Sequence, residues 1–193
     1  KRTTAISASN YEFFHRVLVK LDKKLFWPSK KINLFYESNE KKINFLNFSE
    51  DNNNLLYMFE NDKIKEILNK EIKKKKIKII RKNINKSGDL DGYDLKVLCL
   101  GRNSKIYQNV IKNRSIEKDY KEVALTGYVK HKIKDLSTSQ FFLKEGPLAV
   151  LPFSKNNFSF VWSVKKGFVT KNISSAIKSK ICEILKVKNI NIT

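Results

Sequence analysis

The sequence has few of the residues that most often carry chemistry or covalent constraint. Its 193 residues include two cysteines, two histidines, three prolines and six glycines. Cys99 and Cys182 are far apart and match no metal-binding or redox spacing, so we expect neither a disulfide framework nor a cysteine-bound metal. No hydrophobic run approaches the length of a membrane span, and no secretory signal opens the chain. These absences predict a protein of the cytoplasm.

Motifs of known catalytic sites are also missing. His15 falls inside a predicted helix and His131 at the end of a predicted strand, without a carboxylate or cysteine at a suggestive spacing. We interpret both histidines as structural. The chain has no G-x-G-x-x-G motif, no P-loop, no H-E-x-x-H and no nucleophile elbow. The residues alone therefore predict no catalytic group and no metal site.

Lysine is present in large excess. Forty basic residues stand against 19 acidic ones, which gives a formal net charge of +21. This balance is compatible with nucleic acid or an anionic membrane surface as a partner. However, the chain is also rich in Ile, Asn, Phe and Tyr, residues with AT-rich codons, and arginine forks for base or phosphate recognition are scarce. We favour a coding bias and do not expect nucleic acid as a partner; a lysine-rich RNA-binding or membrane-surface module is kept as an alternative.

The remaining composition predicts a folded chain with helices and strands. Hydrophobic residues make up 41% and aromatic residues 11%, too much for general disorder. Apolar spacing predicts helices in "SASNYEFFHRVLVKL", where Ser9 and Glu12 form a capping box, in "NDKIKEILNKEI", where Asn61 is the cap, and in "NISSAIKSKICEILK". Strands are expected at residues 32–36, 43–48, 77–80, 93–100, 122–130, 141–152 and 158–164. The grouping of strand pairs favours a mixed α/β or α+β fold.

One stretch of the sequence reads as a β-hairpin. In "EGPLAVLPFSKNNFSFVW", residues 145–162, apolar runs flank Ser-Lys-Asn-Asn, which predicts two antiparallel strands with a four-residue loop. Pro147 and Pro152 lie in the first strand although each removes a donor from the ladder. Their presence suggests that this strand has a role besides pairing.

Four segments occur in the order and approximate spacing of one family. They are "RTTAISASNYEFF", "LLYMFENDKIKEIL", "YDLKVLCLGRNSKI" and "FFLKEGPLAVLPFSKNNFSFVW". In them the chain resembles the flavin-dependent aromatic-ring hydroxylases of ubiquinone biosynthesis, similar to 2-octaprenyl-6-methoxyphenol hydroxylase, which have the para-hydroxybenzoate hydroxylase fold. The resemblance runs nearly end to end and is most specific in the hairpin.

The resemblance implies a fold and a reaction. Residues 1–104 would be partial elements of an FAD-binding domain with inserted strands, and residues 105–193 the antiparallel or mixed substrate-side sheet and its following helix. The family hydroxylates a prenylated phenol with FAD, NAD(P)H and O2, and the flavin carries the difficult step. This would explain the missing catalytic residues. Another implied partner is an assembly of ubiquinone-biosynthesis enzymes. Independently of the resemblance, a lysine-rich face could rest peripherally on the inner face of the membrane.

The same resemblance implies that the chain is an internal fragment. The family has its G-x-G-x-x-G motif before the position of residue 1 and a Gly-Asp motif after that of residue 193. We therefore expect the 193-residue chain alone to be inactive and not to retain FAD.

The resemblance also implies cofactor-binding residues. Arg2 matches an arginine that approaches the dinucleotide part of FAD, although it could be a surface cation. Asn61 matches a position near the flavin or its ribityl chain, although it could be only a helix cap. Leu100, Gly101 and Ser104 match a loop that touches FAD and the path of the nicotinamide. Leu100 replaces the usual aspartate, which favours a second hypothesis, a non-catalytic relative that binds prenylated phenols or a partner enzyme.

The hairpin would form a wall of the substrate pocket. The residues implied are Gly146, Pro147, Leu148, Val150 and Pro152. Leu148, Val150 and Pro152 alternate onto one face of the strand, and Ala149, Leu151 and Phe153 onto the other. Both sets are apolar, so the sequence leaves open which face meets substrate. An ordinary edge hairpin is the alternative.

Overall fold

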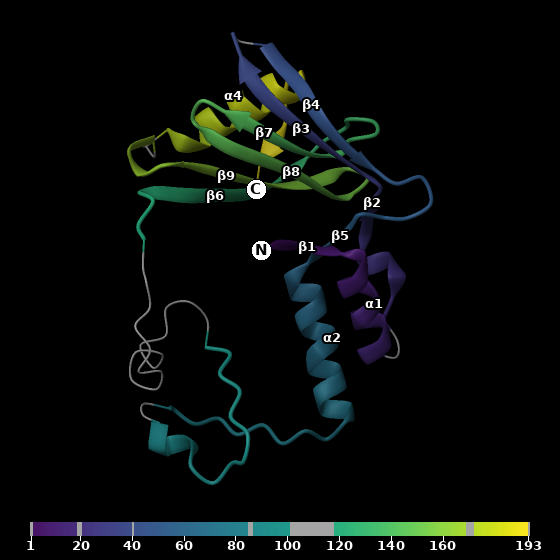
Figure 1. The fold of residues 1–193 in the computed structure, drawn as a ribbon, viewed down its shortest axis with the longest axis vertical. Coiled ribbons are helices and arrows are strands. Elements are labelled where there is room, and N and C mark those ends of the chain that lie inside the picture. The colour runs from purple at the N-terminus through teal and green to yellow at the C-terminus, as the bar shows by residue number, and fades with distance from the viewer. Residues whose placement is uncertain are drawn as a thin grey trace. The chain divides into compact units, whose positions relative to one another are not determined.

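The computed structural model describes residues 2–18, 21–39, 41–84, 87–100, 118–168 and 172–192 (Figure 1). The chain forms two compact units: one comprises Lys1–Lys75 with Lys121–Thr193, and the other is Lys76–Tyr120. The domain boundary expected at residue 104 lies outside the described residues and stays a prediction.

A seven-stranded sheet is the framework of the first unit. In spatial order its strands are β10 (Asn191–Ile192), β6 (Glu122–Lys130), β9 (Asn157–Lys165), β8 (Gly146–Ser154), β7 (Thr138–Leu143), β3 (Lys31–Ser38) and β4 (Lys41–Ser49). Neighbouring strands are antiparallel except β3 and β7, which are parallel. The prediction of a mixed fold with a mixed sheet is confirmed at this level.

Helix α4 (Ile173–Leu185) packs on one face of this sheet, while β1, α1 and α2 lie on the other side (Figure 1). Ile177, Ile181 and Ile184 of α4 are buried against inward-facing side chains of four strands. Those side chains are Val129, Phe141, Leu143, Leu148, Val150, Phe158, Phe160, Trp162 and Val164. Each fully buried aliphatic or aromatic side chain contributes about 1.5–3 kcal/mol, so this cluster is the main core of the unit.

A three-stranded sheet and two helices form a smaller core. Strand β5 (Leu56–Glu60) lies between β1 (Thr3–Ser7) and β2 (Trp27–Ser29), antiparallel to both. Helix α1 (Ala8–Val17) follows β1, and α2 (Asn61–Lys74) follows β5. The buried residues are Leu18, Leu21, Phe26, Phe59 and Ile64. Because β1 and β5 are antiparallel, α1 and α2 begin at opposite ends of this strand pair.

The three predicted helices are present, but two predicted starts are wrong. Helix α1 begins two residues earlier than a Ser9 cap would allow, because Ser7 is the N-cap and its Oγ accepts from the backbone N of Asn10 at 3.4 Å. Asn61 is the first residue of α2 and not its cap; Glu60 is the N-cap position and makes no side-chain cap bond. Asn61 is instead held by β1, as described below.

Most predicted strands are present, with three corrections. Residues 77–80 and 93–100 form no strand, and Ile79 is 65% and Leu95 80% exposed. The predicted strand 141–152 is two strands, β7 and β8, separated by a turn at Lys144 and Glu145. The second unit instead contains a short 3-10 helix, η2 (Ser87–Leu90); two more, η1 (Lys23–Leu25) and η3 (Lys166–Phe168), lie in the first.

The predicted hairpin is confirmed as β8 and β9, although its loop is shorter than expected, since Ser154 pairs with Asn157. The pairing register explains its two prolines. Pro147 pairs with Phe142 of β7, at a point where pairing with β9 has not yet begun. Pro152 pairs with Phe158 of β9, beyond the last pair with β7. Each proline therefore lies where β8 has one paired neighbour, as proline requires in a sheet.

Candidate functional site

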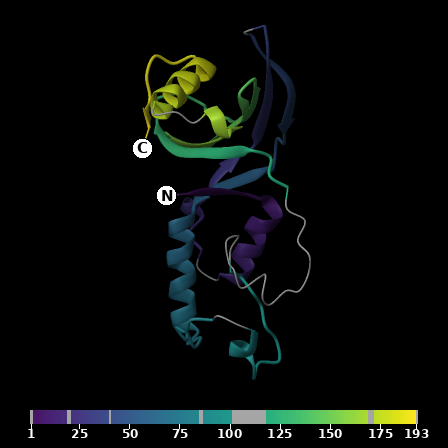
Figure 2. The same ribbon diagram turned by 90° about the vertical axis from the view of Figure 1, so that its left-hand side faces the viewer.

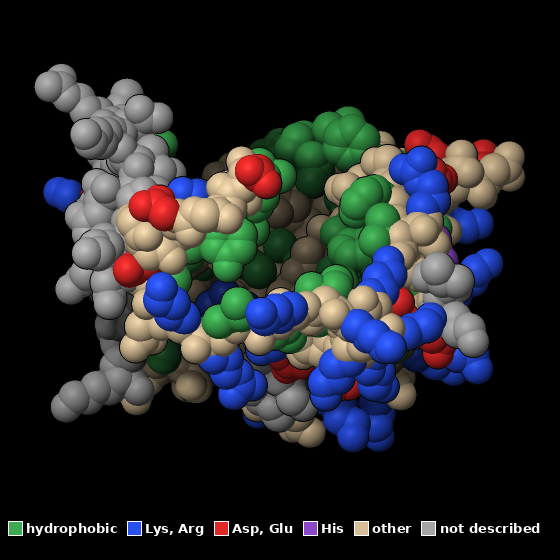
Figure 3. Space-filling view, turned by 90° about the horizontal axis from the view of Figure 1, so that it is seen from below, with side chains coloured by type: hydrophobic (Ala, Val, Ile, Leu, Met, Phe, Trp, Pro, Cys, Tyr) green, Lys and Arg blue, Asp and Glu red, His purple; other side chains and the backbone are tan. Residues whose placement is uncertain are grey.

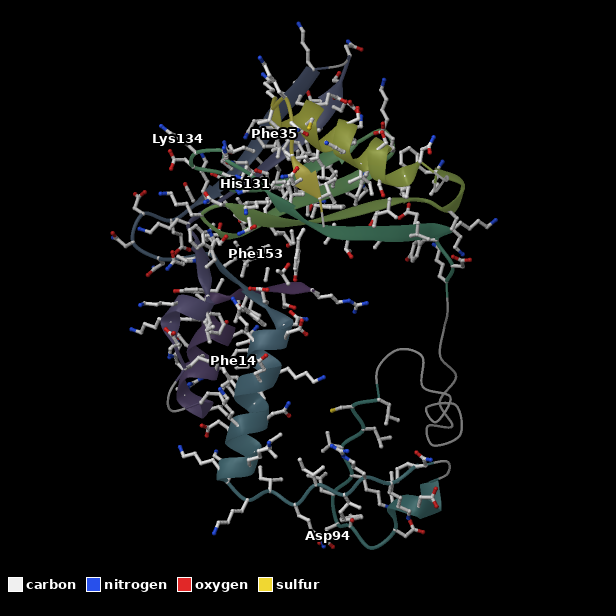
Figure 4. The ribbon with its side chains drawn as sticks, turned by 180° about the vertical axis from the view of Figure 1, so that it is seen from behind. Phe14, Phe35, Asp94, His131, Lys134 and Phe153 are labelled. Carbon is white, nitrogen blue, oxygen red and sulfur yellow. The ribbon has the colours of Figure 1, made fainter. Side chains whose placement is uncertain are left out.

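The face of the seven-stranded sheet opposite α4, called here the open face, is the candidate site. Strand pairing places Thr126, Val161, Ala149, Gln140 and Leu34 side by side in one row across five strands. Directly paired residues point to the same face of a sheet. None of the five is buried, although the alternating residues of the same strands form the main core. Figure 4 shows the two faces: Phe35 lies on the α4 side and Phe153 on the side of β1.

The structure settles which face of β8 is accessible. Leu148 and Val150 are completely buried beneath α4, so a ligand on the open face would not touch their side chains. Pro147 and Ala149 are half-buried and belong to the open face, opposite Phe142 and Val161 respectively. Of the residues expected to bind substrate, Pro147 is therefore the one whose side chain lies on this face.

Gly146 has a structural requirement of its own. Its φ is +130°, and a Cβ added there would collide with the backbone carbonyl oxygen of Ser163. Its own carbonyl oxygen accepts a hydrogen bond of 3.2 Å from Nε1 of Trp162. Only glycine permits this approach of β8 to β9, so the close packing explains Gly146 without a ligand.

Pro152 lies elsewhere, beside a cavity of about 280 Å³. The cavity lies where β2 and β5 meet the end of β8. Its other lining residues include Trp27, Lys31, Met58 and Leu136. The Oγ of Ser29, which also lines it, is 2.8 Å from Oγ1 of Thr138. These hydroxyls bond each other, so they are already satisfied without a ligand.

Two residues expected to bind FAD lie next to each other. The backbone N of Asn61 donates to the carbonyl oxygen of Arg2 at 2.9 Å, and Oγ1 of Thr4 donates to Oδ1 of Asn61 at 2.7 Å. The Nδ2 group of Asn61 has no hydrogen-bond partner among the described residues, and Arg2 is exposed. Asn61, at the start of α2, and the exposed Arg2 are thus adjacent to each other.

This pair adjoins the open face. Thr3, the residue after Arg2, is hydrogen-bonded through its hydroxyl to the hydroxyl of Ser159 in β9. Ser159 lies on the open face and also donates to the carbonyl oxygen of Leu151 at 3.4 Å. Strand β1 therefore joins the expected dinucleotide residues to the expected substrate wall.

Tyr128 is a residue of this region that the sequence reasoning missed. It pairs with Ser159 across β6 and β9, and its ring lies 5.0 Å from that of Phe153. Burial, and then the carboxylates of Glu60 and Asp62, raise the pKa of its phenol, which stays protonated at neutral pH. Its hydroxyl has no hydrogen-bond partner in the described part of the chain. The alternation of β6, with Val129 buried under α4, would have pointed Tyr128 to this face.

The other expected cofactor residues belong to the second unit or lie outside the described residues. Leu100 belongs to the second unit and is 36% exposed. Gly101 and Ser104 lie outside the described residues. The proposed nicotinamide loop stays a prediction from the sequence.

Both histidines have structural surroundings. His131 is buried against Phe158, its Nδ1 accepts from the backbone N of Ile133 at 3.1 Å, and burial lowers its pKa. The ring of His15 lies 4.5 Å from that of Tyr11. Over the residues that the structure describes, no group of three or more His, Cys, Asp or Glu could hold a metal ion.

The middle of the open face thus presents the small and aliphatic side chains of Ala149 and Val161 beside Gln140. At the end near β1, the hydroxyls of Thr3 and Ser159 bond each other, and Ser159 is buried. Comparison with protein-family models gave no match, and comparison with curated proteins gave none either.

Proposed function

We propose that the chain is part of an FAD-dependent monooxygenase that hydroxylates a prenylated phenol in ubiquinone biosynthesis, in the cytoplasm. The observation that supports this most directly is that residues matched to FAD and residues matched to substrate lie on the same side of the sheet. The residues matched to dinucleotide contacts, Arg2 and Asn61, are bonded to each other and linked through Thr3 to the face that carries Pro147 and Ala149. The residues matched to FAD and those matched to substrate come from segments that are far apart in the sequence.

The residues present fit the group that they would hold. The Arg2 guanidinium suits a phosphate, and the unpartnered Nδ2 of Asn61 suits an oxygen of the ribityl chain or flavin. When bound, FAD would supply the reduction by NAD(P)H and the activation of O2. The chain would place the phenol ring against Ala149 and Val161 and keep water from it.

The protein in its complete reading frame provides the test. After reconstitution with FAD, we expect NAD(P)H oxidation to accelerate when a short-chain prenylated phenol is added. The product should contain one oxygen atom from isotopically labelled O2, which mass spectrometry detects. A protein that binds no flavin, or that never transfers oxygen, would refute the proposal.

A variant with a charged side chain on the open face tests whether the substrate binds there. Ala149→Arg should lower kcat/KM for the phenol about tenfold or more, because an apolar wall becomes charged, while FAD content stays near the parent's. Ser175→Arg places the same side chain on an exposed position of α4 and should have no effect. Equal activity of the two variants would place the substrate elsewhere.

A second candidate is a non-catalytic relative that binds prenylated phenols or a partner enzyme of the same pathway. The apolar Leu100, in place of an aspartate expected in the nicotinamide loop, favours it. It would bind the phenol with the same sensitivity to Ala149→Arg but would transfer no oxygen.

A further inference from the structure

Six large apolar side chains are exposed together at one edge of the seven-stranded sheet. We call them the hairpin patch: Tyr36, Ile43, Phe45, Leu46, Phe48 and Phe142. Each is between 40% and 49% exposed. They come from β3, β4 and β7, and β3 and β4 are the outer pair at one side of the sheet in Figure 2. Single exposed apolar residues are common on soluble proteins, but a contiguous group marks a binding surface.

Pairing shows that the patch is continuous on the open face. Phe142 pairs with Tyr36, and Tyr36 with Ile43. A register shift between Leu34 and Phe35 leaves Phe45 as the extra residue of β4. Its ring lies 5.8 Å from the ring of Tyr36 and 6.0 Å from that of Phe142. The three rings line a shallow apolar hollow of about 350 Å³.

The side chains of the hairpin patch are not part of the main core. The residues of these strands that stabilise the fold point the other way: Phe35 stacks on Phe141 at 4.8 Å and packs on the main core. On that same side Lys180 binds Glu145 at 2.9 Å and Lys42 binds Glu183 at 3.0 Å. Strands β3 and β4 are thus already anchored to α4 through their other face. The exposure of the patch needs a separate explanation.

Charge indicates what covers the patch. Exposed lysines flank the patch at the strand ends: Lys31 begins β3, Lys41 begins β4, and Lys144 follows β7. Lysine and arginine side chains are also abundant on the surface seen in Figure 3. With a net charge of +21, two copies of this chain would repel each other. An anionic surface would attract it. Aromatic side chains with flanking lysines are the combination that binds the interface of a bilayer.

We propose that the hairpin patch docks this protein on a membrane surface that carries anionic lipids. Tyr36, Phe45 and Phe142 would enter the boundary between headgroups and acyl chains, and the flanking lysines would bind lipid phosphates. No helix in the described ranges is both long and apolar enough to cross a bilayer, and docking of this kind requires none. The inference rests on the exposed side chains and the charge, and it would hold for a protein without flavin chemistry.

Vesicle sedimentation tests the proposal with the 193-residue chain. We expect it to sediment with vesicles of phosphatidylcholine and phosphatidylglycerol, to bind pure phosphatidylcholine vesicles far less, and to lose affinity as salt rises. Phe45→Ser and Phe142→Ser should each weaken binding to the mixed vesicles about tenfold. Phe13→Ser is the matched control because Phe13 is 53% exposed on α1, and it should bind like the parent.

A second variant reports the position of the patch itself. Phe45→Trp keeps an aromatic side chain, and its fluorescence should be quenched by lipids brominated on their acyl chains when anionic vesicles are added. Circular dichroism should show that each variant retains the parent's secondary structure. Equal binding by Phe45→Ser and Phe13→Ser, or Phe45→Trp fluorescence that the brominated lipids leave unchanged, would overturn the proposal. A parent protein that does not bind anionic vesicles would also overturn the proposal. The patch would then be a dimer interface if the parent forms a dimer that Phe45→Ser dissociates.

Discussion

Two leucines on strand β8 provide a direct test of which sheet face is covered. Leu148 is completely buried under α4, whereas Leu151 is half-buried and pairs with Ser159 on the open face. The same change to alanine at both positions removes the same atoms from opposite sides of one strand. We expect Leu148→Ala to destabilise the protein strongly and Leu151→Ala weakly.

The size of the difference follows from burial. Leu148 belongs to the main core together with Val150, Phe160 and Ile181, and truncating a core leucine costs about 2–5 kcal/mol, including the cavity that remains. For Leu151 the loss should be about 1 kcal/mol, because much of its side chain is already hydrated. A domain of ordinary stability, about 5–15 kcal/mol, would survive either change.

Urea unfolding measures both effects through the fluorescence of Trp162, which lies in the same core. With a dependence of about 1–3 kcal/mol per molar urea, Leu148→Ala should lower the midpoint by about 1 M or more. Equal losses for the two variants would mean that the open face is packed like the covered one. The assignment of the candidate site to that face would then be wrong.

Three other predictions concern single contacts. Gly146→Ala should lower stability by at least about 2 kcal/mol, because it combines a positive φ with a collision at Ser163; an unchanged melting temperature would contradict the local geometry. Ser7→Ala should cost about 0.5–2 kcal/mol and Ser9→Ala less, because Ser7 is the cap of α1; thermal melts of both would show it, and the reverse order would restore the sequence-based cap. Burial raises the pKa of Glu183, but Lys42 and Lys180 lower it by more than burial raises it, so the pKa of Glu183 is below the ordinary 4.5. The stability it contributes is present above the unfolded pKa and lost as pH falls through the folded one, so Glu183→Gln should flatten the acid side of the curve of melting temperature against pH; an unchanged curve would argue against the ion pairs.

The sequence predicted best those elements whose own residues decide their structure. Strands β6, β8 and β9 are long apolar or alternating runs, and the three helices repeat apolar residues with helical spacing. Strand β1, by contrast, has only five residues and pairs with residues of β5 that lie 49 to 57 positions away. The run at 77–80 has the composition of a strand but pairs with no strand among the described residues. Local pattern predicts the tendency to form a strand, and non-local pairing decides whether one forms.

The candidate site was predictable only in part for a related reason. Alternation along β8 separates Leu148 and Val150 from Ala149 and Leu151, but both sets are apolar, so hydrophobicity alone could not say which lies under α4. The helix decides this, and its position depends on contacts of Ile177 and Ile181 with strands more than a dozen residues earlier in the chain. Tyr128 was missed because its polar neighbours, Ser159 and Glu60, come from distant segments.

The two prolines of β8 connect the fold to the proposed function. A strand that is paired on both sides along its full length would exclude them, so their presence requires that β7 and β9 overlap β8 only in part. That partial overlap leaves Pro147 beside Phe142 on the open face at one end and Pro152 beside the cavity at the other. Each proline thus lies at a point where β8 is paired with a strand on one side only. In the proposed function, the ligand contacts side chains in the middle of the open face. The β8 ladder holds those side chains in place there, although it is incomplete at both ends of the strand.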